Sequence, residues 1–114
     1  MILSIERRQI SPEIAVLEMN GRIIQGNNSR DVELKLAELL HDNIHKVIFD
    51  LKGVTVVDST GVGILVVAHG KLKKEGGELR LAGATGLVEE VLKMTSVDKI
   101  TRLYSTAEEA AAAF

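Results

Sequence analysis

The chain has 114 residues, of which 46% are hydrophobic but only 3% are aromatic, and its formal net charge is −2. This length and composition predict one domain with an aliphatic core. The near-neutral charge and the scarcity of aromatic residues argue against the basic and stacking surfaces that bind nucleic acids or anionic membranes. The absence of cysteine excludes disulfides, thiolate zinc sites and cysteine nucleophiles.

We expect neither a targeting segment nor a membrane-spanning segment in these 114 residues. The opening M-I-L-S-I-E-R-R lacks the long apolar region of a signal peptide. No uninterrupted apolar stretch is longer than that from Ile64 to Ala68, whereas a helix that spans a bilayer needs about 20 residues. We therefore expect a soluble, cytoplasmic domain that binds neither membrane nor nucleic acid.

The first third of the chain predicts two strands and a helix. Apolar and β-branched residues favour strands over Ile2 to Ile10 and Ile14 to Met19, joined by a turn at Ser11-Pro12-Glu13. Asn20-Gly21 is typical of a further tight turn. The polar stretch Gln25 to Ser29 predicts a loop that ends in good helix-capping residues. A helical stripe follows, at Val32, Leu36, Leu39 and Leu40.

The centre of the chain holds an apolar run that is interrupted by D-S-T-G at residues 58–61. We expect a strand over Lys46 to Leu51 and then a loop through Val57. Gly61 and Gly63 would weaken the interior of a strand, which argues against one continuous strand. The spacing instead predicts a helix from Ser59 or Thr60 to Lys74, with a helical stripe at Val62, Leu65, Val66, His69 and Leu72.

The last third continues the alternation of strands and helices. It predicts a strand over Glu78 to Ala82, a helix capped by Thr85 that runs to about Met94, and a short strand over Arg102 to Tyr104. S-T-A-E at residues 105–108 fits a capping box that would start a final helix. Strands that alternate with helices imply parallel pairing. The whole chain, 1–114, is therefore predicted to be one α/β domain with a mixed sheet of four to five strands and about four helices.

Asp58, Ser59 and Thr60 fall at the predicted start of the central helix, where two interpretations compete. Such residues commonly cap a helix by accepting a hydrogen bond from a free backbone N–H. The same N–H groups and the helix dipole also favour an anion, so the fold would tolerate a phosphate on a hydroxyl there. Asp58 is either the cap or a residue that orients Ser59 for a kinase.

The motif D-S-T-G-V-G-I-L, preceded by V-I-F-D-L-K-G-V and followed by K-K-E-G-G-E-L-R-L-A, resembles the STAS domain (sulfate transporter and anti-sigma factor antagonist). It is most similar to the stand-alone bacterial anti-sigma factor antagonists. M-N-G-R-I, T-S-V-D-K-I and S-T-A-E-E-A-A extend the resemblance over nearly the whole chain. The resemblance implies that the helices pack mainly on one face of the sheet.

The resemblance also implies a phosphorylation switch. In such antagonists the serine after the motif aspartate is phosphorylated by an anti-sigma factor that is itself a serine kinase. The unphosphorylated antagonist binds that partner, and a sigma factor is released. Here the serine is Ser59 and the aspartate is Asp58, with Thr60 as a candidate second site. A serine phosphatase would reverse the reaction, and the chain itself would be a monomer or weak homodimer with no catalysis, metal or cofactor.

The resemblance further implies which residues meet the partner. The loop from Gln25 to Ser29 lies near the motif in this family, although Q-G-N-N-S is more polar than is usual there. Gly61 and Gly63 are interpreted as packing and access residues. The expected partner-binding residues are Asp58, Ser59, Thr60, Gly61, Gly63, Gln25, Asn27 and Asn28.

Other functions have weaker support in the sequence. A serine hydrolase would need G-x-S-x-G, but Val57 stands two residues before Ser59, and the glycine-rich nucleotide motifs are also absent. His41 and His45 are spaced like metal ligands on a helix, yet a solvated last turn explains them better. The second functional class is a STAS scaffold or transport-associated module that binds partners without a phosphorylation cycle. A kinase-dependent mass increase at Ser59 would separate the two classes.

Overall fold

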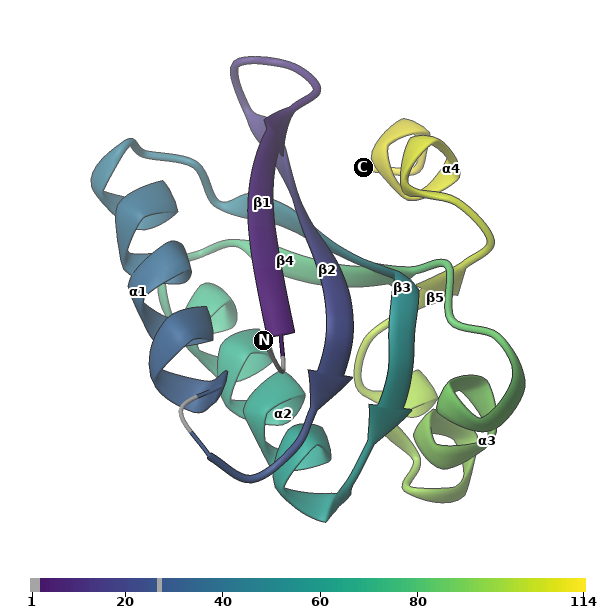
Figure 1. The fold of residues 1–114 in the computed structure, drawn as a ribbon. Coiled ribbons are helices and arrows are strands. Elements are labelled where there is room, and N and C mark those ends of the chain that lie inside the picture. Colours follow the sequence, from purple (N-terminus) through teal and green to yellow (C-terminus); the bar gives the residue numbers. More distant parts are fainter. Residues whose placement is uncertain (1–2, 27) are drawn as a thin grey trace.

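The computed structural model describes residues 3–26 and 28–114. Its five-stranded sheet runs in chain order, β1-β2-β3-β4-β5 (Figure 1). β1 (Leu3–Gln9) pairs antiparallel with β2 (Ile14–Ile23), as expected of a hairpin. β3 (Lys46–Val57), β4 (Glu78–Ala82) and β5 (Leu103–Tyr104) then add to the sheet with parallel pairing. The predicted mixed α/β fold is confirmed.

The α-helices of the described residues divide unequally between the two faces of the sheet. Buried side chains of α1 (Asn28–His41), α2 (Ser59–Lys74) and α3 (Gly86–Met94) join the larger of two hydrophobic clusters. α4 (Ala107–Ala112) packs on the opposite face against a smaller cluster, apart from the other helices in Figure 1. The helices therefore lie mainly on one face, as the resemblance implied. Across the described ranges, none of the helices has the length and apolar character that a membrane crossing requires.

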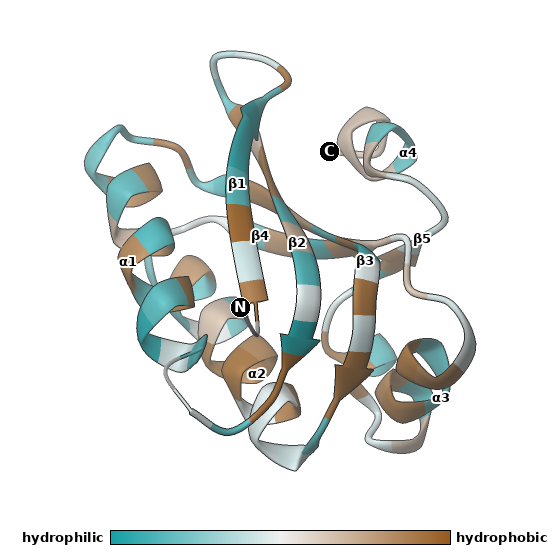
Figure 2. Ribbon diagram, viewed as in Figure 1, coloured by the Kyte–Doolittle hydropathy of each residue, from teal (hydrophilic) through white to brown (hydrophobic). Residues whose placement is uncertain are grey.

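β3 shows how one strand serves both faces. Val47, Phe49 and Leu51 point into the larger cluster, whereas Ile48 between them belongs to the cluster under α4. Successive side chains of a strand point to opposite faces, so a strand that is covered on both sides is apolar throughout. In Figure 2, the middle of α2 is brown and α1 is largely teal, in keeping with a central and a peripheral helix.

β3 is longer than the sequence predicts, because its second half keeps pairing with β2 after β4 has ended. Gly53 lies opposite Asn20, and Val57 lies opposite Ile23. The predicted loop through Val57 is therefore wrong. The β-branched residues at 54–57 favour extended backbone, and Val54 and Val57 are both buried. The chain changes direction only at Asp58, where the polar motif begins.

The predicted tight turn at Asn20-Gly21 is also wrong. Both residues lie within β2, where the pairing with β3 shifts register between Glu18 and Asn20 and again between Gly21 and Arg22. Gly21 has a φ of 115°, which glycine adopts without the steric cost of a side chain. At both shifts the extra residue lies on β3, so β2 continues through Asn20 and Gly21 as a strand and the chain does not reverse.

The predicted bounds of α2 agree with the structure, whereas the predicted caps of α3 and α4 agree less well. α2 runs from Ser59 to Lys74, as predicted. At α4 the capping residue is Thr106, whose Oγ1 accepts a hydrogen bond from the Glu109 N–H at 3.1 Å, so the cap lies one residue later than expected. Thr85 precedes α3, but its side chain makes no capping hydrogen bond within the described part of the chain.

Candidate functional site at the start of the central helix

Two segments that are distant in sequence meet where α2 begins. β2 and β3 end side by side, with Ile23 opposite Val57, and the Asp58 N–H donates to the Ile23 carbonyl at 3.3 Å (Figure 1). From this edge the chain leaves β2 for the loop before α1, and it leaves β3 directly into α2. Such an edge, at the carboxyl ends of parallel strands, is where α/β folds usually bind ligands.

Asp58 caps α2 and also holds the neighbouring loop. Its Oδ1 accepts a hydrogen bond from the Gly61 N–H at 2.7 Å, and its Oδ2 accepts one from the Gln25 N–H at 3.2 Å. Its extended backbone is typical of an N-cap residue. The structure thus assigns the capping role to Asp58 and adds a contact that the sequence did not reveal. A role in orienting Ser59 for a kinase stays a prediction.

Ser59 and Thr60 are the first two residues of α2, and both are exposed. The first N–H groups of a helix have no partner within it, and the helix dipole places partial positive charge at this end. A phosphate on the Ser59 hydroxyl would therefore extend into solvent at a favourable pole and would displace no core residue. The geometry makes Ser59 accessible to an enzyme from outside.

Gly61 and Gly63 have different structural roles. A Cβ on Gly61 would overlap the carbonyl oxygen of Ile23, so the first turn of α2 can approach the end of β2 only with glycine there. A Cβ on Gly63 would meet nothing within 4 Å, and this residue is exposed. Gly61 is thus a packing residue, whereas Gly63 lies open on the surface of the helix.

Asn28 offers less surface to a partner than the sequence suggested. Asn28 begins α1 with only 4% of its surface exposed, and its Nδ2 donates to the Ile24 carbonyl at 2.6 Å and to the Arg22 carbonyl at 3.4 Å. This side chain closes the loop and leaves little of itself for a partner. Gln25 is exposed beside Asp58. Asn27 lies outside the described residues.

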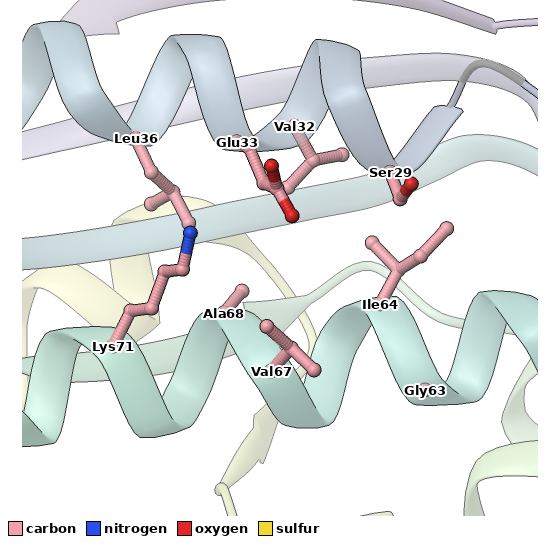
Figure 3. Close-up of a pocket in the computed structure, with 9 residues that line it drawn as sticks. All are labelled: Ser29, Val32, Glu33, Leu36, Gly63, Ile64, Val67, Ala68 and Lys71. Carbon is pink, nitrogen blue, oxygen red and sulfur yellow. The ribbon is translucent and has the colours of Figure 1, made fainter.

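An apolar cavity of about 250 Å³ opens between α1 and α2 (Figure 3). We call it the α1–α2 slot. Gly63, which lines the slot, lies one helical turn beyond Ser59 in α2. Glu33 borders the slot from α1, and Lys71 borders it from α2. Sequence periodicity could not reveal the slot, because it assigns a face to each helix but does not say which helices are neighbours. Its apolar walls are formed by Val32, Leu36, Ile64, Val67 and Ala68.

The described residues hold no cluster of three or more histidine or acidic side chains that could bind a metal ion. His41 lies in the last turn of α1, where a cationic side chain complements the helix dipole. His69 is half-buried on α2, and it lies ten residues after Ser59. Neither histidine is brought to the start of α2.

Comparison with known proteins identifies the family. The STAS domain family matches residues 7–110, and the chain belongs to it. A Thermotoga maritima protein named "Putative anti-sigma factor antagonist" is 32% identical over 73 residues, which are 64% of this chain and 65% of that protein. The chain thus aligns with slightly less than two thirds of the length of this curated relative.

Solved structures share the fold over nearly the whole chain. An anti-sigma factor antagonist from Mycobacterium paratuberculosis superposes with a TM-score of 0.83 at 22% identity, covering 97% of this chain and 92% of that one. Phosphorylated SpoIIAA of Bacillus gives 0.72 at 16% identity, with 96% and 97% covered. A sulfate transporter family protein of Wolinella succinogenes gives 0.79 at 19% identity, with 92% and 87% covered. The fold is therefore common to antagonists and to transporter proteins.

Proposed function

We propose that this protein is an anti-sigma factor antagonist that is switched by phosphorylation of Ser59. The observation that carries the proposal is the position of Ser59, an exposed hydroxyl on the first residue of a helix whose cap, Asp58, is fastened to two segments. A rigid, accessible hydroxyl at the positive pole of a helix suits a group that gains and loses phosphate. The name of the Thermotoga relative and the phosphorylated state of the Bacillus neighbour support this role.

The switch would act through charge at the binding surface. The unphosphorylated protein would bind an anti-sigma factor that is a serine kinase, and so free a sigma factor. A phosphate adds about −1.5 to −2 charges at Ser59. Like charges placed together in an interface cost several kcal/mol, and every ~1.4 kcal/mol is tenfold in affinity. We expect phosphorylation to weaken the complex by roughly two to three orders of magnitude, until a phosphatase restores it.

A direct test combines phosphate mapping with binding. The chain is incubated with ATP and each candidate anti-sigma factor kinase of the same genome, and the modified residue is located by mass spectrometry. We expect modification at Ser59 in the wild type and in Thr60→Ala, and none in Ser59→Ala. Calorimetry should show that Ser59→Ala still binds the kinase and that Ser59→Asp binds at least tenfold more weakly.

The second candidate function is a STAS interaction module without a phosphorylation cycle. The fold match to a sulfate transporter family protein favours it, because that fold serves in transport-associated proteins as well. If no kinase modifies Ser59 and Ser59→Asp binds its partner as tightly as the wild type, this module is the better description. Phosphate found only on Thr60 would also contradict the proposed switch.

A further inference from the structure

The α1–α2 slot adjoins the surface that carries Ser59. Ser59 and Gly63 are four residues apart in α2, so they lie on one side of the helix about one turn apart. The slot then continues from Gly63 along Val67, whose side chain is 52% exposed although it is apolar. A protein that covers the Ser59 hydroxyl would therefore also cover the end of the slot that Gly63 lines.

The size and lining of the slot suit a side chain better than a small molecule. Its volume of about 250 Å³ falls below the ~300–1,000 Å³ that is usual for ligand pockets. The walls are aliphatic on both helices, and Figure 3 shows Leu36 pointing down from α1 and Ile64 pointing up from α2. Partly open pockets of this kind receive the large apolar residues that carry most of the energy of a protein interface.

The charges beside the slot indicate what flanks such a residue. Lys71 extends from α2 toward Leu36, and the Glu33 carboxylate extends from α1 toward α2 (Figure 3). Among the ion pairs of the described residues, neither Lys71 nor Glu33 takes part. Lys71 also belongs to the lysine-rich last turn of α2, so the far end of the slot is basic. A partner that reaches this end would be complementary if it carried an acidic residue there.

We propose that the slot receives one large aliphatic or aromatic side chain of the protein partner, with an acidic residue of that partner against Lys71. This inference rests on the proposed function, because it assigns the anchor of the complex that Ser59 regulates. With the anchor inserted, the partner backbone is held over the first turn of α2. A phosphate on Ser59 would then meet a fixed surface and could not be avoided by a small shift of the partner.

The two glycines of α2 that lie open on the helix provide a matched pair of variants. A Cβ at Gly63 or at Gly70 would meet nothing within 4 Å, and both residues are exposed, but only Gly63 lines the slot. Leucine is a better helix former than glycine, so neither Gly63→Leu nor Gly70→Leu should lower the thermal unfolding midpoint. Gly63→Leu adds a large side chain at a residue that lines the slot, whereas Gly70→Leu adds one at a residue that does not.

The binding arm uses the anti-sigma factor kinase that the wild type binds. We expect Gly63→Leu to weaken that complex at least tenfold and Gly70→Leu to leave it within twofold of the wild type. Lys71→Glu should also weaken it, and more so at low salt, because the acidic residue opposite would then be repelled. If Gly63→Leu binds as tightly as the wild type, the anchor proposal is overturned while the proposed function stands.

A second arm does not depend on the identity of the partner. N-acetyl-leucinamide, a stand-in for the anchoring side chain, is titrated into the protein at millimolar concentrations and followed by methyl NMR. Saturable shifts at Val32 and Val67 in the wild type and in Gly70→Leu, but not in Gly63→Leu, support the slot as a side-chain site. If these methyl groups do not shift, the proposal is overturned. If no kinase binds the wild type, the proposed function fails. This titration alone then decides whether the slot accepts an apolar side chain.

Discussion

At the scale of single residues, Asp58 does more than an ordinary helix cap. One carboxylate accepts hydrogen bonds from the first turn of α2 and from a loop residue 33 positions away in the sequence. The cap could be predicted from the sequence, because Asp before an apolar helix is a common pattern. The bond to Gln25 could not, because it depends on β2 and β3 ending at the same edge.

Replacing Asp58 should therefore cost more than a cap alone. We expect Asp58→Ala to lower the free energy of unfolding by about 1 kcal/mol for the lost cap, and by somewhat more for the lost hydrogen bond from the Gln25 N–H. Urea denaturation measures this loss. Asp58→Asn, which keeps an acceptor oxygen and good capping ability, is the control and should lose clearly less. Equal losses in the two variants would contradict the capping role.

Gly61 gives a second prediction at this scale. A methyl group at Gly61 would overlap the Ile23 carbonyl oxygen, so α2 would have to move away from the end of β2. We expect Gly61→Ala to destabilise the fold by about 1–3 kcal/mol, as overpacking does. Gly63→Ala should instead stabilise it by about 0.5–1 kcal/mol, since nothing opposes the added methyl group. Thermal unfolding of both variants tests the contrast, and a loss in both would contradict it.

At the scale of elements, α4 is held to the sheet by polar contacts at both ends. Arg8 pairs with Glu108 at 3.1 Å, and the Arg80 Nη1 donates to the Ala110 carbonyl at 3.0 Å. The Arg80 guanidinium also lies 3.9 Å from the centre of the Phe114 ring, a cation–π contact. A helix this short has little stability of its own, so these contacts and the small apolar cluster beneath it keep it folded.

Acid should loosen this docking. A backbone hydrogen bond at the start of α4, and then the hydrogen bond from Arg8, lower the pKa of Glu108. A group whose pKa is lower when folded stabilises the fold above its unfolded pKa, about 4.3 for glutamate, and loses that effect as pH falls through the folded pKa. NMR titration should give Glu108 a pKa below that of an ordinary glutamate, and Arg8→Met should raise it. An unchanged pKa in Arg8→Met would contradict the role of this ion pair.

The elements themselves show where sequence patterns succeed and where they stop. The helical spacing predicted α2 with its observed bounds. Leu65 and Leu72 of the predicted stripe are buried, as expected, but the buried face also includes residues outside that stripe. Ile64 and Ala68 are buried, whereas Val66, which the stripe included, is 37% exposed. A helix made from an apolar run has apolar residues on all sides, so hydrophobic periodicity identifies its buried face poorly. The second half of β3 was missed because Gly61 and Gly63, which argue against one strand over the whole apolar run, say nothing about residues 54–57.

At the scale of the whole molecule, the alternation of strands and helices was enough to predict a mixed sheet with parallel pairing. The strand order and the placement of α4 on the opposite face were not readable from periodicity, since both depend on which elements become neighbours. The same limit applies to the candidate site. Ser59 was proposed from its motif and from the family resemblance, whereas the α1–α2 slot exists only once two helices pack side by side.

The location of α4 on the face opposite α2 also makes the protein convenient to attach to a surface. Ala112 and Ala113 are exposed beside Phe114, and the chain has no cysteine of its own, so a single cysteine introduced at either position would be a unique coupling point. A sensor chip or a fluorescent dye joined there would lie behind the sheet (Figure 1). Ser59 and the slot would remain turned toward the solution, where a captured partner can be counted molecule by molecule.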